Sequence, residues 1–380
     1  MELKDLRKRI DEIDEKLLPL FLERMNIANE VAQYKKENNL PILNKTRERE
    51  ILKNVMETAG DEFEIYAHRF YSTIFELSRA YQSTLMPENG GVRAEVEKAK
   101  ENVKESFPQN GVIACQGVEG AYAAMAADRM FPRGNLVFLK TFEAVFDAVE
   151  NGLCQFGILP IENSSNGSVR ATYDLLLKKN VKIVRSERLC IRHELLVKPG
   201  AKLANIKKIY SHDQALGQCS KFLKALGDKV QVISVDNTAM AAKFVSECED
   251  NSVAAIASHN AADIYGLTAL DENIMDSDNN YTRFVCIAKD AELYPGANHI
   301  GLILACEHKP GALYDILSKL AAFEVNLIKL ESCPIVGHDF EFMFFFEMQA
   351  SVLDPKVVAM LESIEQGSER FVFLGNYLEV

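Results

Sequence analysis

Three features are missing from this sequence: an excess of basic residues, a long apolar run and closely spaced cysteines. The formal net charge is −12, with 43 Lys and Arg against 55 Asp and Glu, so a basic surface for a nucleic-acid backbone is not expected. No apolar run approaches the ~18 residues of a membrane span, and the first residues lack the apolar core of a signal peptide. We therefore expect a cytoplasmic protein with no nucleic-acid or membrane partner, which holds any anionic ligand through a local cluster of cations.

The eight cysteines lie at least 20 residues apart. Because there is no C-x-x-C pair and no Cys/His cluster, the sequence predicts no metal site. Most of the cysteines stand in apolar runs, as Cys286 does, and we expect them to be small buried hydrophobic residues rather than disulfide partners.

The chain has 380 residues, 48% of them hydrophobic and 26% charged, which is long enough for several packed domains. Its residue pattern changes from helical periodicity, through a stretch rich in Lys and Glu, to short apolar runs that alternate with helical segments. Seven of these runs, between residues 111 and 287, predict strands. The expected fold is therefore multidomain: an all-α domain at 1–86, a linker at 87–109, a two-lobed α/β domain at 110–290 and a C-terminal domain at 298–380.

Apolar residues recur at helical spacing from Leu3 onward, which predicts a first helix of roughly 35 residues, loosened at Pro19. Further helices are expected from about Thr46 and over Phe63–Leu85. A helix as long as the first cannot bury its apolar stripe alone, so we expect a homodimer or a higher homo-oligomer. The linker contains the charged stretch 95–105, which has little to bury and predicts a solvated helix.

Cationic and polar side chains gather on these predicted helices. Arg24 and Lys35 are 11 residues apart and so lie within about 20° of each other on one helix face. Arg7 lies about 100° away and cannot easily join them from its own chain, although an antiparallel partner chain could supply it. Ser78 and Gln82 are an i, i+4 pair on the third helix. Taken singly these are ordinary surface residues, but cations beside neutral donors together can form a pocket for carboxylates.

Over nearly its whole length this helical region resembles the all-helical chorismate mutase family, through Leu6–Asp14, Glu23-Arg24, Lys35, Arg47–Glu50 and Ser78-x-x-x-Gln82. The reaction of that family, the rearrangement of chorismate, needs no nucleophile. It needs the reactive conformer of the substrate to be held and the charge that develops on the ether oxygen to be stabilised. The resemblance implies that the carboxylates are bound by Arg24, by Arg7 from the partner chain, and by Arg47 and Ser78. It implies that Lys35 and Gln82 donate to the ether oxygen and that Glu48 holds the ring hydroxyl. Asn44, where the family commonly has Asp, would make a secondary hydroxyl contact.

Polar loop segments lie near the predicted strands of the α/β region, at 117–122, 160–168, 211–218 and 280–284. Open α/β sheets bind ligands at such places, although each segment alone is ordinary turn chemistry. Ser211-His212-Asp213 does not indicate a hydrolase triad, because adjacent residues point apart and no G-x-S-x-G motif is present. The absence of G-x-G-x-x-G disfavours a nicotinamide-dependent enzyme.

Together with Asn237-Thr238-Ala239, these segments make residues 111–290 resemble prephenate dehydratase, because Gly-Ala-Tyr, Pro-Ile-Glu-Asn-Ser and Thr-Arg-Phe occur in the family's order. The resemblance implies a cleft in which Thr282 donates a hydrogen bond to the departing ring hydroxyl of prephenate. No cofactor is expected, since the formation of an aromatic ring drives the reaction. The residues implied to bind or orient the substrate are Asn163, Ser164, Ser211, Gln218, Thr238, Arg283 and Phe284.

The last 82 residues follow the order strand, helix, strand, strand, helix, strand, which predicts a ferredoxin-like βαββαβ fold. They resemble an ACT domain, a small-molecule sensor, through Gly311-Ala-Leu-Tyr314 and Glu331-Ser-Cys-Pro334, with Cys333 in place of the usual Arg. The resemblance implies that phenylalanine is an effector, with contacts from Gly311, Ala312, Leu313, Glu331 and Ser332. A dimerisation module that binds no ligand is the alternative.

The three resemblances, in this order along one chain, predict an enzyme of phenylalanine biosynthesis with two activities, one of an isomerase and one of a lyase. It would convert chorismate to prephenate, and prephenate to phenylpyruvate, under feedback by phenylalanine. Two alternatives remain open: only one of the two activities is live, or the chain is a non-catalytic small-molecule binding or sensor protein.

Overall fold

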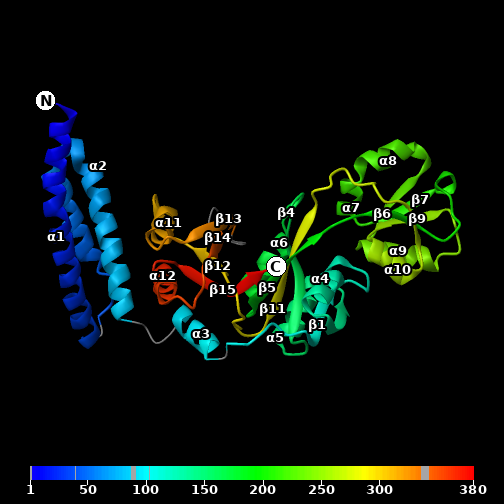
Figure 1. Ribbon diagram of the computed structural model, residues 1–380, viewed down its shortest axis with the longest axis horizontal. Helices are drawn as coiled ribbons and strands as arrows, with labels where there is room; N and C mark the ends of the chain where they lie inside the picture. Colours follow the sequence, from blue (N-terminus) through cyan, green and yellow to red (C-terminus); the bar gives the residue numbers. More distant parts are fainter. Residues whose placement is uncertain (1, 39, 87–90, 102, 335–341) are drawn as a thin grey trace. The chain divides into compact units, whose positions relative to one another are not determined.

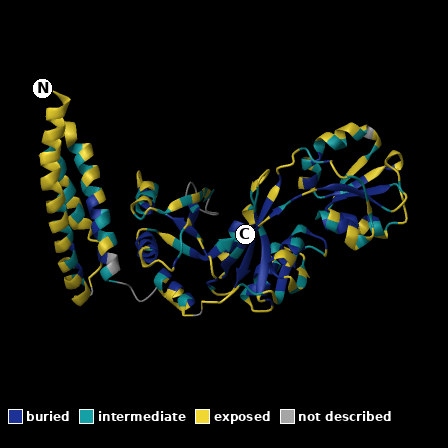
Figure 2. Cartoon of the chain, viewed as in Figure 1, coloured by how far each residue is buried: buried dark blue, intermediate teal, exposed yellow. Residues whose placement is uncertain are grey.

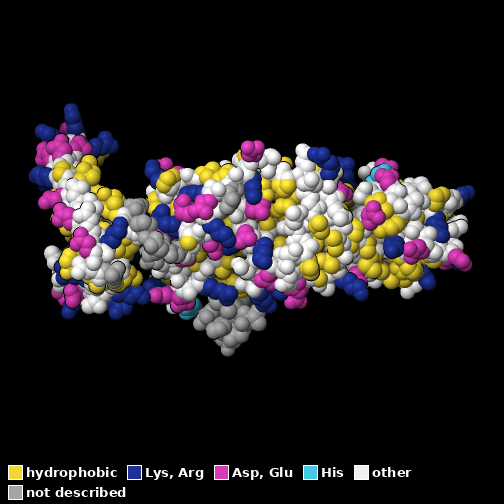
Figure 3. Space-filling view, turned by 90° about the horizontal axis from the view of Figure 1, so that it is seen from below, with side chains coloured by type: hydrophobic (Ala, Val, Ile, Leu, Met, Phe, Trp, Pro, Cys, Tyr) yellow, Lys and Arg dark blue, Asp and Glu magenta, His cyan; other side chains and the backbone are white. Residues whose placement is uncertain are grey.

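The computed structural model describes residues 2–38, 40–86, 91–101, 103–334 and 342–380 (Figure 1). The chain forms two compact units, each built from separate stretches. The first comprises Met1–Lys98, Leu304–Phe344 and Val352–Phe371, and the second comprises Ala99–Ile303, Phe345–Ser351 and Val372–Val380. On the face shown in Figure 3, acidic and basic side chains are interspersed rather than gathered by sign.

The first unit begins with the predicted helices. Helix α1 spans Leu3–Glu37 and stays helical through Pro19. Helix α2 spans Lys45–Leu85 but is interrupted at Gly60, where φ is 70° and ψ is 170°, so two helical segments follow α1, as predicted. Figure 2 shows α1 as mostly exposed, and its apolar residues include Leu20, which is 63% exposed. None of the described helices is both long and apolar enough to cross a membrane.

Helix α3 (Gly91–Lys100) corrects the expectation of a solvated linker helix. Val92, Val96 and Ala99 are buried, and their i, i+4, i+7 spacing is that of an apolar stripe. The stripe was missed because Lys and Glu fill the positions between its members. Arg93 forms a paired ion contact with the buried Glu362, so this helix is anchored to the C-terminal part of its own unit.

The C-terminal part has the predicted βαββαβ order. Its strands are arranged β13-β14-β12-β15, and β12, β14 and β15 each have residues in both units. Buried Val358, Leu361 and Ile364 give α12 a wide apolar face. The elements are β12 (His299–Ala305), α11 (Ala312–Ala322), β13 (Asn326–Pro334), β14 (Phe342–Gln349), α12 (Pro355–Gln366) and β15 (Arg370–Glu379).

The second unit contains two sheets. The first sheet runs β15-β5-β11-β3-β1-β2 within this unit, with β4 paired to β3, and the second runs β10-β6-β9-β7-β8. Strands β11 and β3 are antiparallel and place Thr282 opposite Asn163. The elements of the first sheet and its helices are β1 (Asn110–Gln116), α4 (Tyr122–Met130), β2 (Arg133–Leu139), α5 (Phe142–Glu150), β3 (Phe156–Asn163), β4 (Gly167–Ser168), α6 (Arg170–Lys178), β5 (Lys182–Cys190) and β11 (Tyr281–Ala288).

The seven strands predicted in this region are present, and β2, β4, β6 and β10 were missed. Two of the missed strands, β6 and β10, are only four residues long, too short for a periodic pattern to distinguish them from loops. The second sheet and its helices comprise β6 (Glu194–Val197), β7 (Lys208–Ser211), α7 (Asp213–Gln218), α8 (Ser220–Leu226), β8 (Gln231–Ser234), α9 (Thr238–Glu247), β9 (Val253–Ala257), α10 (His259–Tyr265) and β10 (Thr268–Asp271).

Candidate active sites

In the first unit, α1 and α2 bring together four of the predicted site residues. Arg24 Nη1 donates to Ser78 Oγ at 2.7 Å, and Lys35 Nζ donates to Gln82 Oε1 at 3.0 Å. Ser78 and Gln82 are both buried although they are polar, because the cations of the facing helix bind them. Burial lowers the pKa of Lys35, and the nearby carboxylate of Glu48 acts in the opposite direction.

Arg79, which sequence reasoning missed, belongs to the same cluster. Its Nη1 lies 2.5 Å from Glu48 Oε1, so the carboxylate is held by a neighbouring guanidinium. The available signal was its position three residues before Gln82, which places both on one side of α2. Glu48 therefore has a fixed orientation beside Lys35.

Three other predicted residues lie apart from this cluster within one chain. Arg47 is exposed, with Nη1 3.3 Å from Glu50 Oε2, and the Asn44 side chain caps α2 by accepting from the backbone N–H of Arg47. Arg7 is exposed near the start of α1, and no contact joins it to the cluster among the residues that the structure describes. The cluster formed by a single chain thus lacks three members of the predicted set.

In the second unit, a cavity of about 260 Å³ has walls from both sheets and their helices. Five of the predicted residues line it: Asn163, Gln218, Thr238, Thr282 and Phe284. They come from the end of β3, from β11, and from helices α7 and α9 of the second sheet. These are neutral donors and one aromatic ring, as the sequence indicated.

Asn163 and Thr282 are in direct contact at this cavity. Asn163 Nδ2 donates to Thr282 Oγ1 at 2.9 Å, while Asn163 Oδ1 accepts from the backbone N–H groups of Ser165 and Asn166, both at 3.0 Å. The antiparallel register of β3 and β11 sets this approach. Thr282 is buried but lines the cavity, so its hydroxyl can reach a bound molecule.

Arg283 does not point into the cavity, contrary to the expectation that it contacts substrate. Side chains alternate along a strand, so Arg283 faces away from the side that Thr282 and Phe284 share. It is 7% exposed, and its guanidinium lies 2.5 Å from Glu347 and 3.0 Å from Glu379. Together with Glu162, 3.2 Å away on β3, these carboxylates neutralise its charge.

Two predicted serines also lie outside the residues that line the cavity. Ser211 is fully buried and donates to the carbonyl of Ile256 at 2.6 Å. Ser164 donates to the carbonyl of Asn279 at 3.2 Å and accepts from the backbone N–H of Tyr281 at 2.9 Å. In this structure, both serines hold the backbone that surrounds the cavity.

Three polar residues of one hydrogen-bonded group were missed from the sequence: Tyr122 and His193, which line the cavity, and Asn280, which bonds two of its lining residues. His193 is 3% exposed, with Nε2 3.1 Å from Gln218 Oε1 and Nδ1 3.1 Å from the Tyr122 hydroxyl. Asn280 is 1% exposed and bonds both Gln218 and Asn163, at 2.9 Å and 2.8 Å. Tyr122 and Asn280 stand inside segments already singled out, which was the available signal for them, whereas His193 lies outside all four segments.

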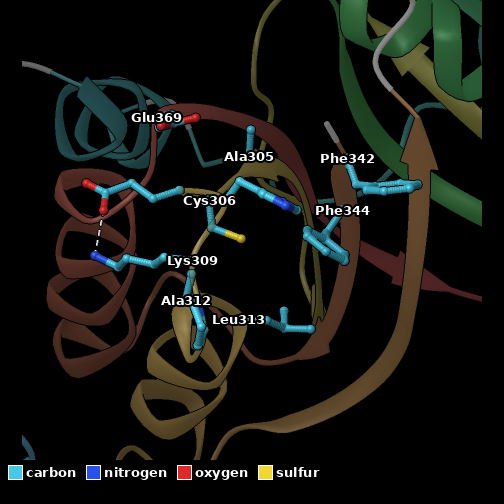
Figure 4. Close-up of a pocket in the computed structure, with 11 residues that line it drawn as sticks. Ala305, Cys306, Lys309, Ala312, Leu313, Phe342, Phe344 and Glu369 are labelled. Carbon is cyan, nitrogen blue, oxygen red and sulfur yellow. Dashed lines mark hydrogen bonds and ion pairs between the residues drawn. The ribbon is translucent and has the colours of Figure 1, made fainter. Parts of the chain in front are cut away.

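A third candidate site lies in the C-terminal part of the first unit, at a cavity of about 440 Å³ that is called the third cavity below (Figure 4). The predicted Ala312 and Leu313 line it, whereas Glu331 and Ser332 do not. Its other lining residues combine aromatic rings with charged groups: Ala305, Cys306, Glu307, His308, Lys309, Pro310, Phe342, Phe344 and Glu369. The dashed contact in Figure 4 joins Lys309 Nζ to Glu307 Oε2 at 2.5 Å.

Comparison with known proteins agrees with this division. A family model for chorismate mutase type II matches residues 6–83, and one for prephenate dehydratase matches residues 113–292. The bifunctional chorismate mutase/prephenate dehydratase of Aquifex aeolicus is 30% identical over 377 residues, covering 99% of this chain and 98% of that protein.

Two solved structures resemble the later part of the chain. Prephenate dehydratase from Arthrobacter aurescens, in complex with L-Phe, is 27% identical with a TM-score of 0.64, covering 70% of this chain and 89% of that one. GqqA, described as a novel type of quorum quenching acylase, is 30% identical with a TM-score of 0.64, covering 71% of this chain and 98% of that one.

The chain therefore joins a helical chorismate mutase domain to an α/β prephenate dehydratase domain. It belongs to the bifunctional chorismate mutase/prephenate dehydratase family. The enzyme activities of this family are those of an isomerase and a lyase in the synthesis of phenylalanine.

We expect His193 to make the second unit less stable in acid. Burial lowers its pKa to about 4, whereas in the unfolded chain its pKa is about 6.5. Between these values the unfolded chain binds more protons, so the free energy of unfolding falls as the pH decreases from 6.5 to 4, by up to about 3 kcal/mol. Urea unfolding across this range should show a shallower fall for His193→Gln, and an equal slope would contradict the prediction.

Proposed function

We propose that the first unit rearranges chorismate at the α1–α2 cluster and that the second unit dehydrates prephenate at the Thr282 cavity. The observation that carries this proposal is the kind of contact in each site: cations that donate to neutral side chains in the first, and neutral side chains that hydrogen-bond each other in the second. We assign residues 1–86 to the mutase, 87–109 to the linker, 110–290 to a dehydratase of two lobes and 298–380 to an ACT regulatory domain.

In the mutase, the substrate oxygen that gains charge would lie beside Lys35 and Gln82. Lys35 Nζ donates to Gln82 Oε1 and to the carbonyl of Ile42, so its third hydrogen and the NH₂ of Gln82 would donate to that oxygen, and a half-buried ammonium stabilises developing negative charge more strongly than one in water. Arg24 and Ser78, joined at 2.7 Å, would bind a carboxylate. Glu48, oriented by Arg79, would accept from the ring hydroxyl.

In the dehydratase, Thr282 would donate its proton to the ring hydroxyl of prephenate. The electron pair of the bond between the ring and its carboxylate enters the ring, carbon dioxide leaves, and the bond from the ring to the hydroxyl oxygen breaks, so that the hydroxyl departs as water. Solvent returns a proton to Thr282. A threonine is a weak acid, but aromatisation supplies the driving force, and a fixed donor needs no reorganisation.

An acyl-transfer activity is not proposed for this chain. The Ser211 hydroxyl is buried and donates to the carbonyl of Ile256, and His212 accepts from the backbone of Gln214 as a helix cap. A nucleophile needs a base within hydrogen-bond reach, and these two side chains do not form such a pair.

A second copy of the chain would complete the mutase site. Much of the apolar stripe of α1 is exposed, including Leu6, Ile13 and Leu20, which is unfavourable for a helix in water. We propose a homodimer, or a higher oligomer, in which this stripe is buried and Arg7 reaches Arg24 and Lys35 of the other chain.

We also propose that phenylalanine binds the third cavity and inhibits the enzyme. Leu313, Phe342 and Phe344 supply an apolar wall for an aromatic ring, while Lys309 and Glu369 supply charges for the carboxylate and ammonium groups. This combination of an apolar pocket with a few polar groups is usual for small ligands. Gly311, Glu331 and Ser332 do not line the cavity in one chain and would contribute through a second copy.

Substitution at one site should remove one activity and leave the other. Lys35→Ala should lower mutase kcat by about 100-fold or more, because the ether oxygen loses its cation, and Thr282→Val should lower dehydratase kcat similarly. Each variant is assayed separately with chorismate and with prephenate. The unaffected activity serves as the control, and a variant that keeps both activities would refute the assignment of its residue.

A mixture of two inactive mutase variants should recover activity if Arg7 acts across the dimer. Arg7→Ala and Lys35→Ala homodimers, mixed equally and allowed to exchange subunits, form heterodimers in which one site carries both defects and the other none. About one quarter of wild-type mutase activity should then return. A mixture that stays at the mean of the two variants would show that both residues serve the same chain's site.

Filling the third cavity should weaken the response to phenylalanine. Leu313→Trp should raise the phenylalanine concentration for half inhibition of the dehydratase by roughly 10-fold or more, because the larger ring takes the space of the effector. Tyr314→Phe, on the same helix but outside the lining residues, is the matched control. Equal inhibition of both variants would place the effector elsewhere.

A further inference from the structure

We infer that Asn280 and His193 are positioning residues of the dehydratase, which fix the direction of the Thr282 hydroxyl hydrogen through a line of hydrogen bonds. The line runs from His193 through Gln218, Asn280 and Asn163 to Thr282. This inference rests on the proposed role of Thr282 as the proton donor. It adds two residues that do not themselves line the reacting hydroxyl.

The polarity of the line, which is the direction from donor to acceptor along it, can be read at Asn163, where the line meets the backbone. Asn163 Oδ1 accepts from the peptide N–H groups of Ser165 and Asn166, and a peptide N–H can only donate. The amide group of Asn163 must therefore present its NH₂ to the other side, where Asn280 Oδ1 lies at 2.8 Å and Thr282 Oγ1 at 2.9 Å.

The donor and acceptor roles of Asn280, Gln218 and His193 follow from the orientation of Asn163. Because Asn280 Oδ1 accepts from Asn163, its NH₂ faces Gln218 Oε1 at 2.9 Å. Gln218 Oε1 also lies 3.1 Å from His193 Nε2, and two acceptors cannot bond each other. His193 Nε2 must therefore carry a hydrogen, and Nδ1 then accepts from the Tyr122 hydroxyl, whose one hydrogen is shared between Nδ1 and the carbonyl of Arg192.

The backbone N–H groups of Ser165 and Asn166 alone would hold the Asn163 amide weakly. Ser165 and Asn166 are exposed, so water can replace their bonds at little cost. Asn280 is 1% exposed, and turning the Asn163 amide over would set its oxygen against the buried oxygen of Asn280, at a cost of roughly 1–3 kcal/mol. The buried end of the line therefore holds the amide more firmly than the exposed loop.

The orientation of the Asn163 amide decides whether the hydroxyl hydrogen of Thr282 is available to a bound molecule. The Thr282 oxygen accepts from Asn163, and among the described residues no acceptor takes its hydrogen. The hydrogen is therefore free to donate to a molecule in the cavity that Thr282 lines. With the Asn163 amide reversed, Oδ1 would take that hydrogen, and the leaving hydroxyl would lose its donor.

Two substitutions of similar size separate this role from simple packing. Asn280→Asp keeps an oxygen that accepts from Asn163, whether or not the carboxyl is ionised, whereas Asn280→Leu removes the acceptor and keeps the volume. If Asn280 serves packing alone, the buried charge of Asn280→Asp is the more damaging change. If Asn280 instead fixes the orientation of the Asn163 amide, Asn280→Leu is the more damaging change.

We expect Asn280→Leu to lower dehydratase kcat roughly 10- to 100-fold with KM little changed, and Asn280→Asp to retain most of kcat. The reverse order, or two equal losses, overturns the inference. Should Thr282→Val retain full dehydratase activity, the proposed function itself fails. If only Thr282→Val is inactive and both Asn280 variants match the wild type, the positioning role fails alone.

A measurement on the unaltered protein guards against misfolded variants. Nitrogen-15 NMR of the histidine-labelled full-length enzyme, with His193→Gln used to assign the signal, reports which ring nitrogen carries hydrogen. The line of bonds requires Nε2 for His193. A hydrogen on Nδ1 with Nε2 bare would show that the polarity runs the other way, which contradicts the inference.

Discussion

The dehydratase site depends on the antiparallel pairing of β3 with β11. This register places Asn163 opposite Thr282, and the short span between neighbouring strands brings an amide and a hydroxyl into hydrogen-bond contact without a long flexible side chain. In the role proposed for Thr282, a rigid sheet therefore does what a charged acid does in other enzymes: it presents one hydrogen in a fixed direction. The second sheet contributes Gln218 and Thr238 to the same cavity.

The two sites solve different electrostatic problems. The role proposed for the mutase cluster is to bind carboxylates in a chain with a net charge of −12, which requires a local concentration of cations whose charge is not cancelled. Arg24 and Lys35 achieve this by bonding neutral partners, Ser78 and Gln82, which do not cancel their charge. The dehydratase cavity contains few charges, and the order of donors and acceptors matters there instead.

Much of this organisation could be predicted from the sequence, because periodicity and motif order are local properties. The α1 stripe, seven strands of the α/β region and the βαββαβ order all follow from spacing along the chain. Arg283 was misplaced because adjacency in a motif was read as shared function, whereas strand alternation turns it away from Thr282. His193 and Asn280 escaped prediction because their bonds join segments 25 to 117 residues apart, which no local pattern reveals.

The burial of Arg283 has a consequence for how separable the C-terminal region is. Its guanidinium is neutralised by Glu347 and Glu379, which come from the last two strands, yet it stands next to Thr282 on β11. A chain truncated before those strands would leave Arg283 with Glu162, at 3.2 Å, in place of three carboxylates, and breaking up a buried ion-pair network is destabilising. The last two strands therefore help to stabilise the sheet that carries Thr282, and their removal should weaken it.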